Sequence, residues 1–198
     1  MLTITYSIIV LSKEQQNARR IVAALERSLY SGQWNDRRDI NLAWLERVFN
    51  RLMHVNRFCH ERKVELYLEP VVHNISCGDH AMFDRLDSLN ASSSRILRHA
   101  CQQAQRILEG SETGADTLVS AIELYCAQLQ ERFSLEESEL LPAAYRLLTQ
   151  EEWFRIAAHC LLGPGKGKGK GGKDRKGRQT CFYGISGTGQ RERLRYAQ

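Results

Sequence analysis

The sequence predicts an all-α protein, namely an antiparallel (up-down) four-helix bundle with a short fifth helix and a disordered basic tail. Three observations support this prediction. Apolar residues recur at intervals of three and four along four long segments, as they do on the buried face of a helix. Short loops join these segments, which is typical of a bundle. The chain holds only 3 prolines, so most of its length can be helical.

The four apolar stripes give the expected bounds of the long helices. They span residues 11–29, 40–53, 79–108 and 116–148. The second stripe is expected to bend around residues 56–60 and to resume through Leu68, just before Pro70. The fifth helix begins with the capping pattern Thr149-Gln-Glu-Glu152, in which each end of the motif satisfies a backbone N–H of the other.

Residues 1–10 are apolar but do not have the pattern of a targeting segment. They lack the basic region and the small-residue cleavage site of a signal peptide. They are also too short to span a bilayer. We expect them to pack on the bundle as an entry segment, and no transmembrane segment is expected in the chain.

Charge divides the chain into two expected domains, a helical bundle (1–160) and a tail (161–198). The tail holds ten Lys/Arg and two Asp/Glu, whereas the bundle holds 18 and 21. The overall net charge of +5 is therefore concentrated in the tail and is not evidence for a basic face on the bundle. The Gly/Lys-rich tail cannot bury apolar surface, so it is predicted to be disordered.

Three interpretations of the tail remain open. It is a solvated extension, a weak electrostatic contact of residues 163–195 with nucleic acid or an anionic surface, or sequence under little selection. The tail contains no motif that would recognise a base sequence, so any contact with nucleic acid would be nonspecific.

The cysteines favour a reducing compartment. None of the 6 cysteines belongs to a CxxC pair or has zinc-finger spacing. Most lie in apolar helical contexts, where a free cysteine behaves as a small buried hydrophobe. A cytoplasmic location is the expectation.

Two pairs of side chains at i and i+4 are the first candidates for chemistry, because residues at this spacing share one face of a helix. They are His80 with Asp84 in the third helix and Arg132 with Glu136 in the fourth. His60 and Glu65 are five residues apart, so a bend is needed before both can face one metal ion. Inward-facing His and carboxylate side chains are how helical bundles build non-haem iron sites.

Three segments resemble the hemerythrin-like (HHE cation-binding) domain family of the bacterial type. The strongest is 135–158, with its Glu-Glu pair, its apolar-Pro step and the later Leu-Thr, acidic pair and Trp. Residues 57–68 are similar to the family's paired-His and acidic segment, and 78–81 to the segment that supplies a third-helix His. The resemblance covers roughly residues 11–159 and implies a four-helix bundle with a non-haem iron site.

The same resemblance implies an incomplete ligand set. Gln15 and Arg132 occupy positions where the family has His, and the His-His pair becomes Cys59-His60. The implied ligands that remain are His60, His80 and Glu136, with Asp84 and Glu65 as further candidates. Arg132 cannot lose its proton and is expected to pair with the inward carboxylates instead.

Two hypotheses for function follow. In the first, the protein binds iron in a mononuclear or incomplete di-iron site, and the resemblance implies oxygen, nitric oxide or redox sensing, or iron handling. In the second, a buried ion-pair network replaces the metal, and the bundle acts as a regulatory or protein-interaction module. An enzyme is a weaker third hypothesis, because no pair of nucleophile and base stands out in the sequence.

Overall fold

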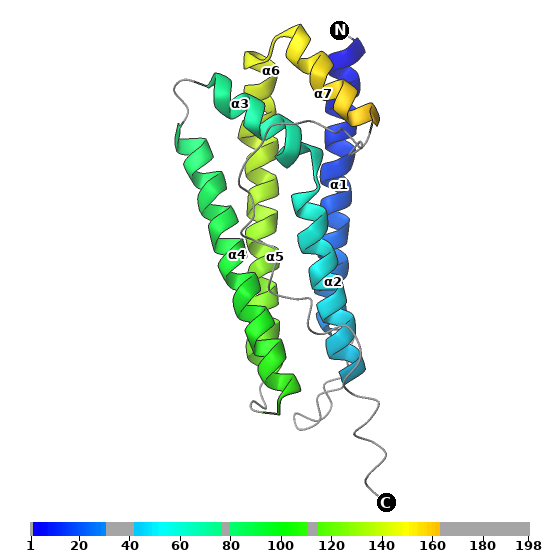
Figure 1. Ribbon diagram of the computed structural model, residues 1–198, viewed down its shortest axis with the longest axis vertical. Coiled ribbons are helices and arrows are strands. Elements are labelled where there is room, and N and C mark those ends of the chain that lie inside the picture. Colours follow the sequence, from blue (N-terminus) through cyan, green and yellow to red (C-terminus); the bar gives the residue numbers. More distant parts are fainter. Residues whose placement is uncertain (1, 31–41, 77–79, 111–114, 163–198) are drawn as a thin grey trace, which may run out of the picture. The chain divides into compact units, whose positions relative to one another are not determined.

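The computed structural model describes residues 2–30, 42–76, 80–110 and 115–162, and these residues are helical almost throughout (Figure 1). The helices are α1 (Leu2–Tyr30), α2 (Leu42–His60), α3 (Glu69–Ile75), α4 (His80–Leu108), α5 (Ala115–Leu135), α6 (Leu141–Leu147) and α7 (Gln150–Leu162). Two single turns of π-helix, η1 (Val64–Leu68) and η2 (Glu136–Leu140), lead directly into α3 and α6. The described part of the chain contains no strand, so the all-α prediction is confirmed.

The four long helices lie alongside one another (Figure 1). Helix α1 contacts α2 and α5, and α4 packs along α5. The short helix α7 packs on α1 and η1, and α3 contacts α6. The described residues all belong to one compact unit, which spans residues 1–164. The predicted tail begins at 161, but residues 161 and 162 belong to α7, and the rest of the predicted tail falls on residues that are not described.

The observed helices differ from the predicted ones at two ends. Helix α1 begins at Leu2, because Ile4, Ile8 and Leu11 continue its apolar stripe at intervals of four and three. The long fourth segment is divided, since α5 ends at Leu135 and the chain continues through η2 and α6. The expected bend after residues 56–60 is present, because α2 ends at His60 and η1 begins at Val64.

A proline follows each π-helical turn after one intervening residue. In η1 the N–H of Glu69 donates a hydrogen bond to the carbonyl of Val64. In η2 the N–H of Leu141 donates to the carbonyl of Glu136. Pro70 and Pro142 follow, and a proline ring clashes with the carbonyl four residues before it in a regular helix. The wider turn moves that carbonyl aside, so the chain continues as a helix. Such turns also redirect side chains and occur often at functional sites.

The apolar interior consists of two clusters. The long-helix core lies between α1, α2, α4 and α5 and includes Leu25, Leu52, Ile122 and Phe133. The short-helix core is formed by η1, α3, η2, α6 and α7 with the adjoining ends of α1 and α4, and it includes Leu68, Leu140 and Trp153. No helix of the described residues is both long and apolar enough to cross a membrane.

Candidate functional site

A layer of buried and half-buried polar side chains separates the two cores. On α1, Gln15 falls between Leu11 of the short-helix core and Ala18 of the long-helix core. On the last turn of α5 and in η2, Glu136 falls between Phe133 and Leu140 in the same way. We refer to the following residues as the polar layer: Gln15, Arg62, Glu65, Glu69, Asn90, Arg132 and Glu136.

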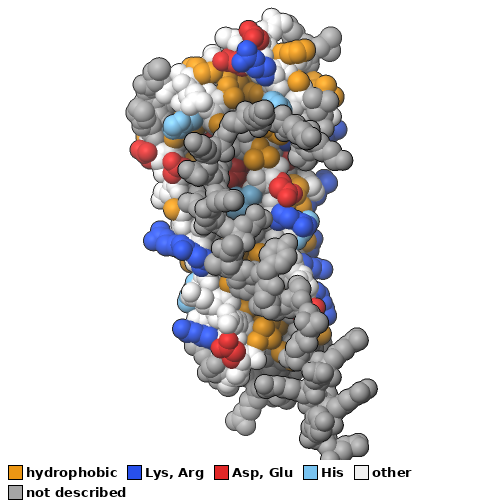
Figure 2. Space-filling model, in the orientation of Figure 1, with side chains coloured by type: hydrophobic (Ala, Val, Ile, Leu, Met, Phe, Trp, Pro, Cys, Tyr) orange, Lys and Arg blue, Asp and Glu red, His pale blue; other side chains and the backbone are white. Residues whose placement is uncertain are grey.

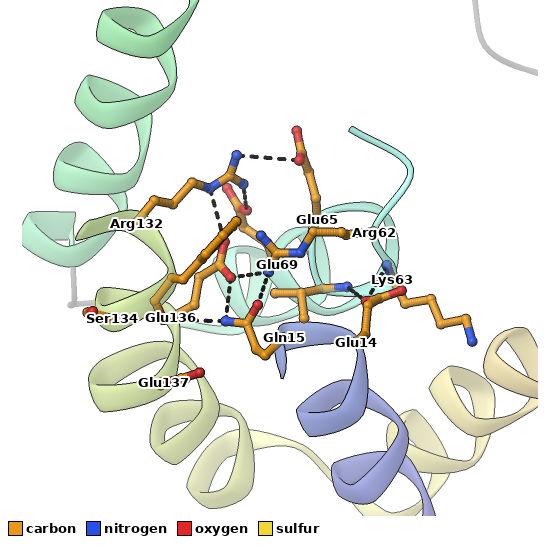
Figure 3. Close-up of polar contacts among 12 residues, drawn as sticks. Glu14, Gln15, Arg62, Lys63, Glu65, Glu69, Arg132, Ser134, Glu136 and Glu137 are labelled. Atoms are coloured by element: carbon orange, nitrogen blue, oxygen red, sulfur yellow. Dashed lines mark hydrogen bonds and ion pairs between the residues drawn. The ribbon is translucent and has the colours of Figure 1, made fainter. Parts of the chain in front are cut away.

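Glu136 is the centre of the polar layer (Figure 3). Its side chain is 0% exposed, and its Oε2 accepts hydrogen bonds from Gln15 Nε2 at 2.8 Å and from Arg62. Its Oε1 lies 3.0 Å from Arg132 Nε, as an ion pair without hydrogen-bond alignment. A buried carboxylate requires compensating charge, and here two guanidinium groups provide it.

Arg132 links three carboxylates from neighbouring turns. Its Nη2 donates to Glu69 Oε2 at 3.2 Å, its Nη1 is 3.4 Å from Glu65 Oε2, and it also donates to Asn90. Burial acts to lower the pKa of Arg132, but the charges of Glu65, Glu136 and Glu69 outweigh it and raise that pKa. The guanidinium therefore stays charged, and the predicted pairing of Arg132 with inward carboxylates is confirmed.

Arg62 is the second buried cation, and sequence reasoning missed it. Its side chain is 0% exposed, and Nη2 donates to Gln15 Oε1 and to Glu136. The guanidinium lies 4.5 Å from the centre of the Phe133 ring, a favourable cation–π geometry. A signal was present, because Arg62 continues the buried stripe of Val55 and Cys59 at intervals of four and three.

Glu65 and Glu69 face Arg132 from η1 and the start of α3, and their protonation responds to different causes. Burial raises the pKa of Glu69. Burial also acts to raise the pKa of Glu65, but the hydrogen bond with His60 and the charge of Arg132 outweigh it and lower that pKa. His60 Nδ1 is 3.2 Å from Glu65 Oε1, and the His60 side chain is 57% exposed, so it marks the surface end of the layer.

Glu14 supports the layer from the adjoining turn of α1. Its Oε2 accepts the backbone N–H of Lys63 at 2.8 Å and that of Val64 at 3.3 Å. These N–H groups belong to the start of η1, where they have no partner within the helix, and a carboxylate is favourable there. Glu14 thus fixes the link that carries Arg62 into the interior, although burial raises the pKa of Glu14.

The acidic run at the end of α5 divides between the interior and the surface. Glu136 points inward, whereas Glu137 points away from the layer and pairs with Arg19 at 2.8 Å (Figure 3). Glu139 pairs with Arg85 at 3.0 Å on the surface. Only one of the three carboxylates therefore belongs to the site.

The residues named as candidate ligands are only partly brought together. Glu65 and Glu136 both contact Arg132. Gln15 joins them indirectly, because its side chain donates to Glu136. His60 reaches only Glu65 at the edge of the layer. Asp84 lies exposed on α4, outside the polar layer. His80 begins α4, but its side chain is not among those described.

These residues do not fit a di-iron centre. Among the described residues, no group of three or more His, Cys, Asp or Glu side chains is arranged to hold a metal ion. The carboxylates that face the interior are engaged by Arg62 and Arg132, which would place two permanent positive charges beside any metal. Burial raises the pKa of the Cys59 thiol beside the layer to about 11, so the thiolate that acts as a nucleophile is scarce at neutral pH.

The comparisons with known proteins return no relative. The chain matches no protein-family model, no curated protein and no solved structure. The polar layer and its surroundings are therefore the basis for a functional proposal.

Proposed function

We propose that this chain is a hemerythrin-like antiparallel four-helix bundle in which the polar layer replaces the metal site, and that it acts as a regulatory or protein-interaction module. The observation that carries the proposal is the meeting of Gln15, Arg132 and Glu136 in one buried layer. Gln15 and Glu136 are 121 positions apart, yet the resemblance assigns each to a ligand position. That these residues meet in the fold supports the positions that the resemblance assigns to them. It also supports the proposal that Gln15 and Arg132 have replaced metal ligands.

Charge balance supports the metal-free form. A family-type site would combine inward carboxylates with metal cations, whereas this layer combines Glu65, Glu69 and Glu136 with two guanidinium groups. The compensating charge is therefore covalently part of the chain. We expect folding to be independent of metal, in contrast to proteins whose metal-binding free energy is part of their folding free energy.

A protein-interaction module needs a single stable surface. The polar layer favours one arrangement of the helices over the alternatives. Buried ion pairs contribute little net stability but penalise arrangements that separate the partners. The layer connects α1, α4, α5, η1, α3 and η2 through named partners. A shift of η1, α3, α5 or η2 would separate buried ion pairs, and a shift of α1 or α4 would remove the hydrogen bonds of Gln15 or Asn90.

Metal analysis of the full chain tests this proposal. Protein purified without oxygen is measured before and after incubation with ferrous iron, and its unfolding is followed with and without a chelator. We expect less than about a tenth of an equivalent of iron and no effect of the chelator, since structural sites bind far more tightly than that. Near-stoichiometric iron, or absorption bands of an oxo-bridged di-iron centre, would contradict the metal-free proposal.

An iron site is the second candidate, because two residues that the resemblance names as ligands, His60 and Glu65, lie 3.2 Å apart. In that case the protein would take iron as a cofactor and oxygen or nitric oxide as a small ligand, with a sensing or iron-handling role. The same loading experiment separates this candidate from the first. The variant His60→Ala should then lose the bound iron, whereas the matched surface variant His54→Ala should keep it.

A further inference from the structure

The outer face of α1 carries a column of exposed cations. Lys13, Arg20 and Arg27 recur every seven residues, which places them within about 20° of one line along the helix. All three are exposed. The exposed residues between the first two cations, Gln16 and Asn17, are polar and uncharged.

Helix α2 adds a second column beside the first. Its exposed cations Arg47 and Arg51 are about 40° apart around the helix axis. Arg51 Nη1 donates to the carbonyl of Ala24 at 3.0 Å, and Ala24 lies on the column of α1 between Arg20 and Arg27. The two columns therefore form one surface, which we call the basic face. In Figure 2, Lys and Arg side chains follow the right-hand edge of the molecule, where α1 and α2 lie in Figure 1.

The cations of the basic face lack acidic partners. Within the described part of the chain, Arg20, Arg27 and Arg47 form no ion pair with an acidic side chain. Arg19, the neighbour of Arg20, shows the contrast, because it turns toward η2 and pairs with Glu137 at 2.8 Å.

The nearest acidic residues lie at the margin of the basic face. The exposed Glu46 is rotated by about 140° from Arg51 around the axis of α2, and Arg57 lies within about 20° of Glu46. Glu61 follows Arg57 by one turn, because the Glu61 N–H donates to the Arg57 carbonyl at 3.1 Å. Arg57 is therefore not part of the basic face, and Glu46 and Glu61 lie at its margin.

The acidic residues of α1 beside the column are engaged by other elements. Glu14 accepts the backbone N–H of Lys63 at 2.8 Å, and Glu26 accepts a hydrogen bond from Gln130 Nε2 at 2.8 Å.

Such a surface is unfavourable for the isolated protein. Arg47 and Arg51 are like charges at i and i+4, a spacing that destabilises a helix by a few tenths of a kcal/mol. Their potential adds to that of Arg20 and Arg27 on the adjacent α1, and summed charge of one sign attracts an oppositely charged partner.

We propose that the basic face binds the phosphate backbone of a nucleic acid, without reading its sequence. Arginine is the cation best suited to phosphate, because its planar fork donates two hydrogen bonds. A duplex carries one charge per about 1.7 Å of its axis, so cations spaced by about 6 and 10 Å along a helix meet phosphates in any register.

The composition of the basic face argues against a membrane as its partner. Helical surfaces that bind membranes combine cations with exposed large apolar side chains. In the described residues, no exposed large apolar side chain lies between the cations of either column, and the exposed Ile9, Tyr30 and Leu42 lie beyond the column ends. This nucleic-acid partner goes beyond the protein partner proposed above and does not depend on whether the polar layer holds a metal.

Binding of the full chain to a duplex DNA of about 20 base pairs, measured by fluorescence anisotropy from about 50 to 200 mM salt, tests the proposal. The test variant is Arg20→Gln/Arg27→Gln/Arg47→Gln. The control is Arg95→Gln/Arg98→Gln/Arg146→Gln, which removes the same charge from exposed positions on α4 and α6. Both retain residues 161–198 with their ten Lys/Arg, so any binding by that segment contributes equally.

We expect the test variant to bind at least about tenfold more weakly at low salt, with the slope of log K against log salt reduced by about 2 to 3. The control should keep the slope of the unchanged protein. Equal losses in both variants, or no binding by the unchanged protein, would overturn the proposal. Losses confined to binding of phosphatidylserine vesicles would assign the face to membranes instead. Equal unfolding midpoints of the two variants exclude a folding defect, and iron loading remains an independent test of the proposed function.

Discussion

The long-helix core and the polar layer lie on the same helices but are held together in different ways. In the long-helix core, regular α-helices bury apolar side chains such as Leu25, Leu52 and Phe133, whose contacts are numerous and individually weak. In the polar layer, Arg132 and Glu136 have a few named partners, next to a π-helical turn. A loss in the core should scale with volume, whereas a loss in the layer should depend on which charges are left unpaired.

The largest expected effect is that of Glu136→Ala. This change leaves Arg62 and Arg132 buried without their central counter-ion, and breaking a buried pair in this way costs about 3–5 kcal/mol. Urea unfolding measures the free energy of unfolding. The matched control Glu137→Ala removes an exposed pair with Arg19 and should cost less than about 1 kcal/mol. Similar losses in both variants would show that the layer carries no special charge requirement.

The joint replacement Arg62→Met/Arg132→Met/Glu136→Leu tests the same difference between core and layer. It replaces three buried charged side chains of the layer by apolar ones. The two remaining carboxylates, Glu65 and Glu69, are partly exposed and can be solvated. Replacing a buried ion network by apolar groups is often neutral or stabilising by about 1–4 kcal/mol. We expect unfolding stability at least equal to that of the unchanged protein, with broader amide signals in nuclear magnetic resonance spectra if the layer selects one helix arrangement. A loss above about 3 kcal/mol would mean that the ion network itself stabilises the fold.

Glu65 and Glu69 should respond to pH in opposite directions. The pKa of Glu69 is raised in the folded protein, so its contribution is present below the unfolded pKa and is lost as pH rises through the folded value. The pKa of Glu65 is lowered, so its contribution is present above the unfolded pKa and is lost as pH falls through the folded value. Unfolding of Glu65→Gln and Glu69→Gln between about pH 3 and 6 should give stability differences from the unchanged protein with opposite slopes. Parallel slopes would contradict this assignment.

The sequence predicted the regular parts of the fold better than the irregular ones. Periodicity located α2, α4 and the capped start of α7, and the pattern Thr149 to Glu152 is present with Glu152 Oε2 accepting the Thr149 N–H at 2.7 Å. Periodicity did not predict the two π-helical turns, because the widening before Pro70 and Pro142 changes the angle per residue on which the pattern depends.

The same limit applied to the site. Glu136 and Arg132 were identified because they are four residues apart on one face, and Gln15 because of the resemblance. Arg62 and Glu69 were missed, since one lies in the link between α2 and η1 and the other follows a π-helical turn. The basic face was missed for a different reason. A net count over residues 1–160 includes carboxylates that are buried or paired elsewhere, such as Glu136 and Glu137, and so conceals an uneven surface.

The smallest expected effect is that of His60→Ala at the exposed end of the layer. The pair of His60 with Glu65 is partly exposed, so its removal should cost less than about 1 kcal/mol at neutral pH. Arg132 still compensates the charge of Glu65 from the interior, at 3.4 Å. A loss comparable to that of Glu136→Ala, measured by urea unfolding, would mean that the charge requirement extends to the surface. The layer would then be a continuous path from His60 to Arg62, rather than an interior network that ends at Glu65.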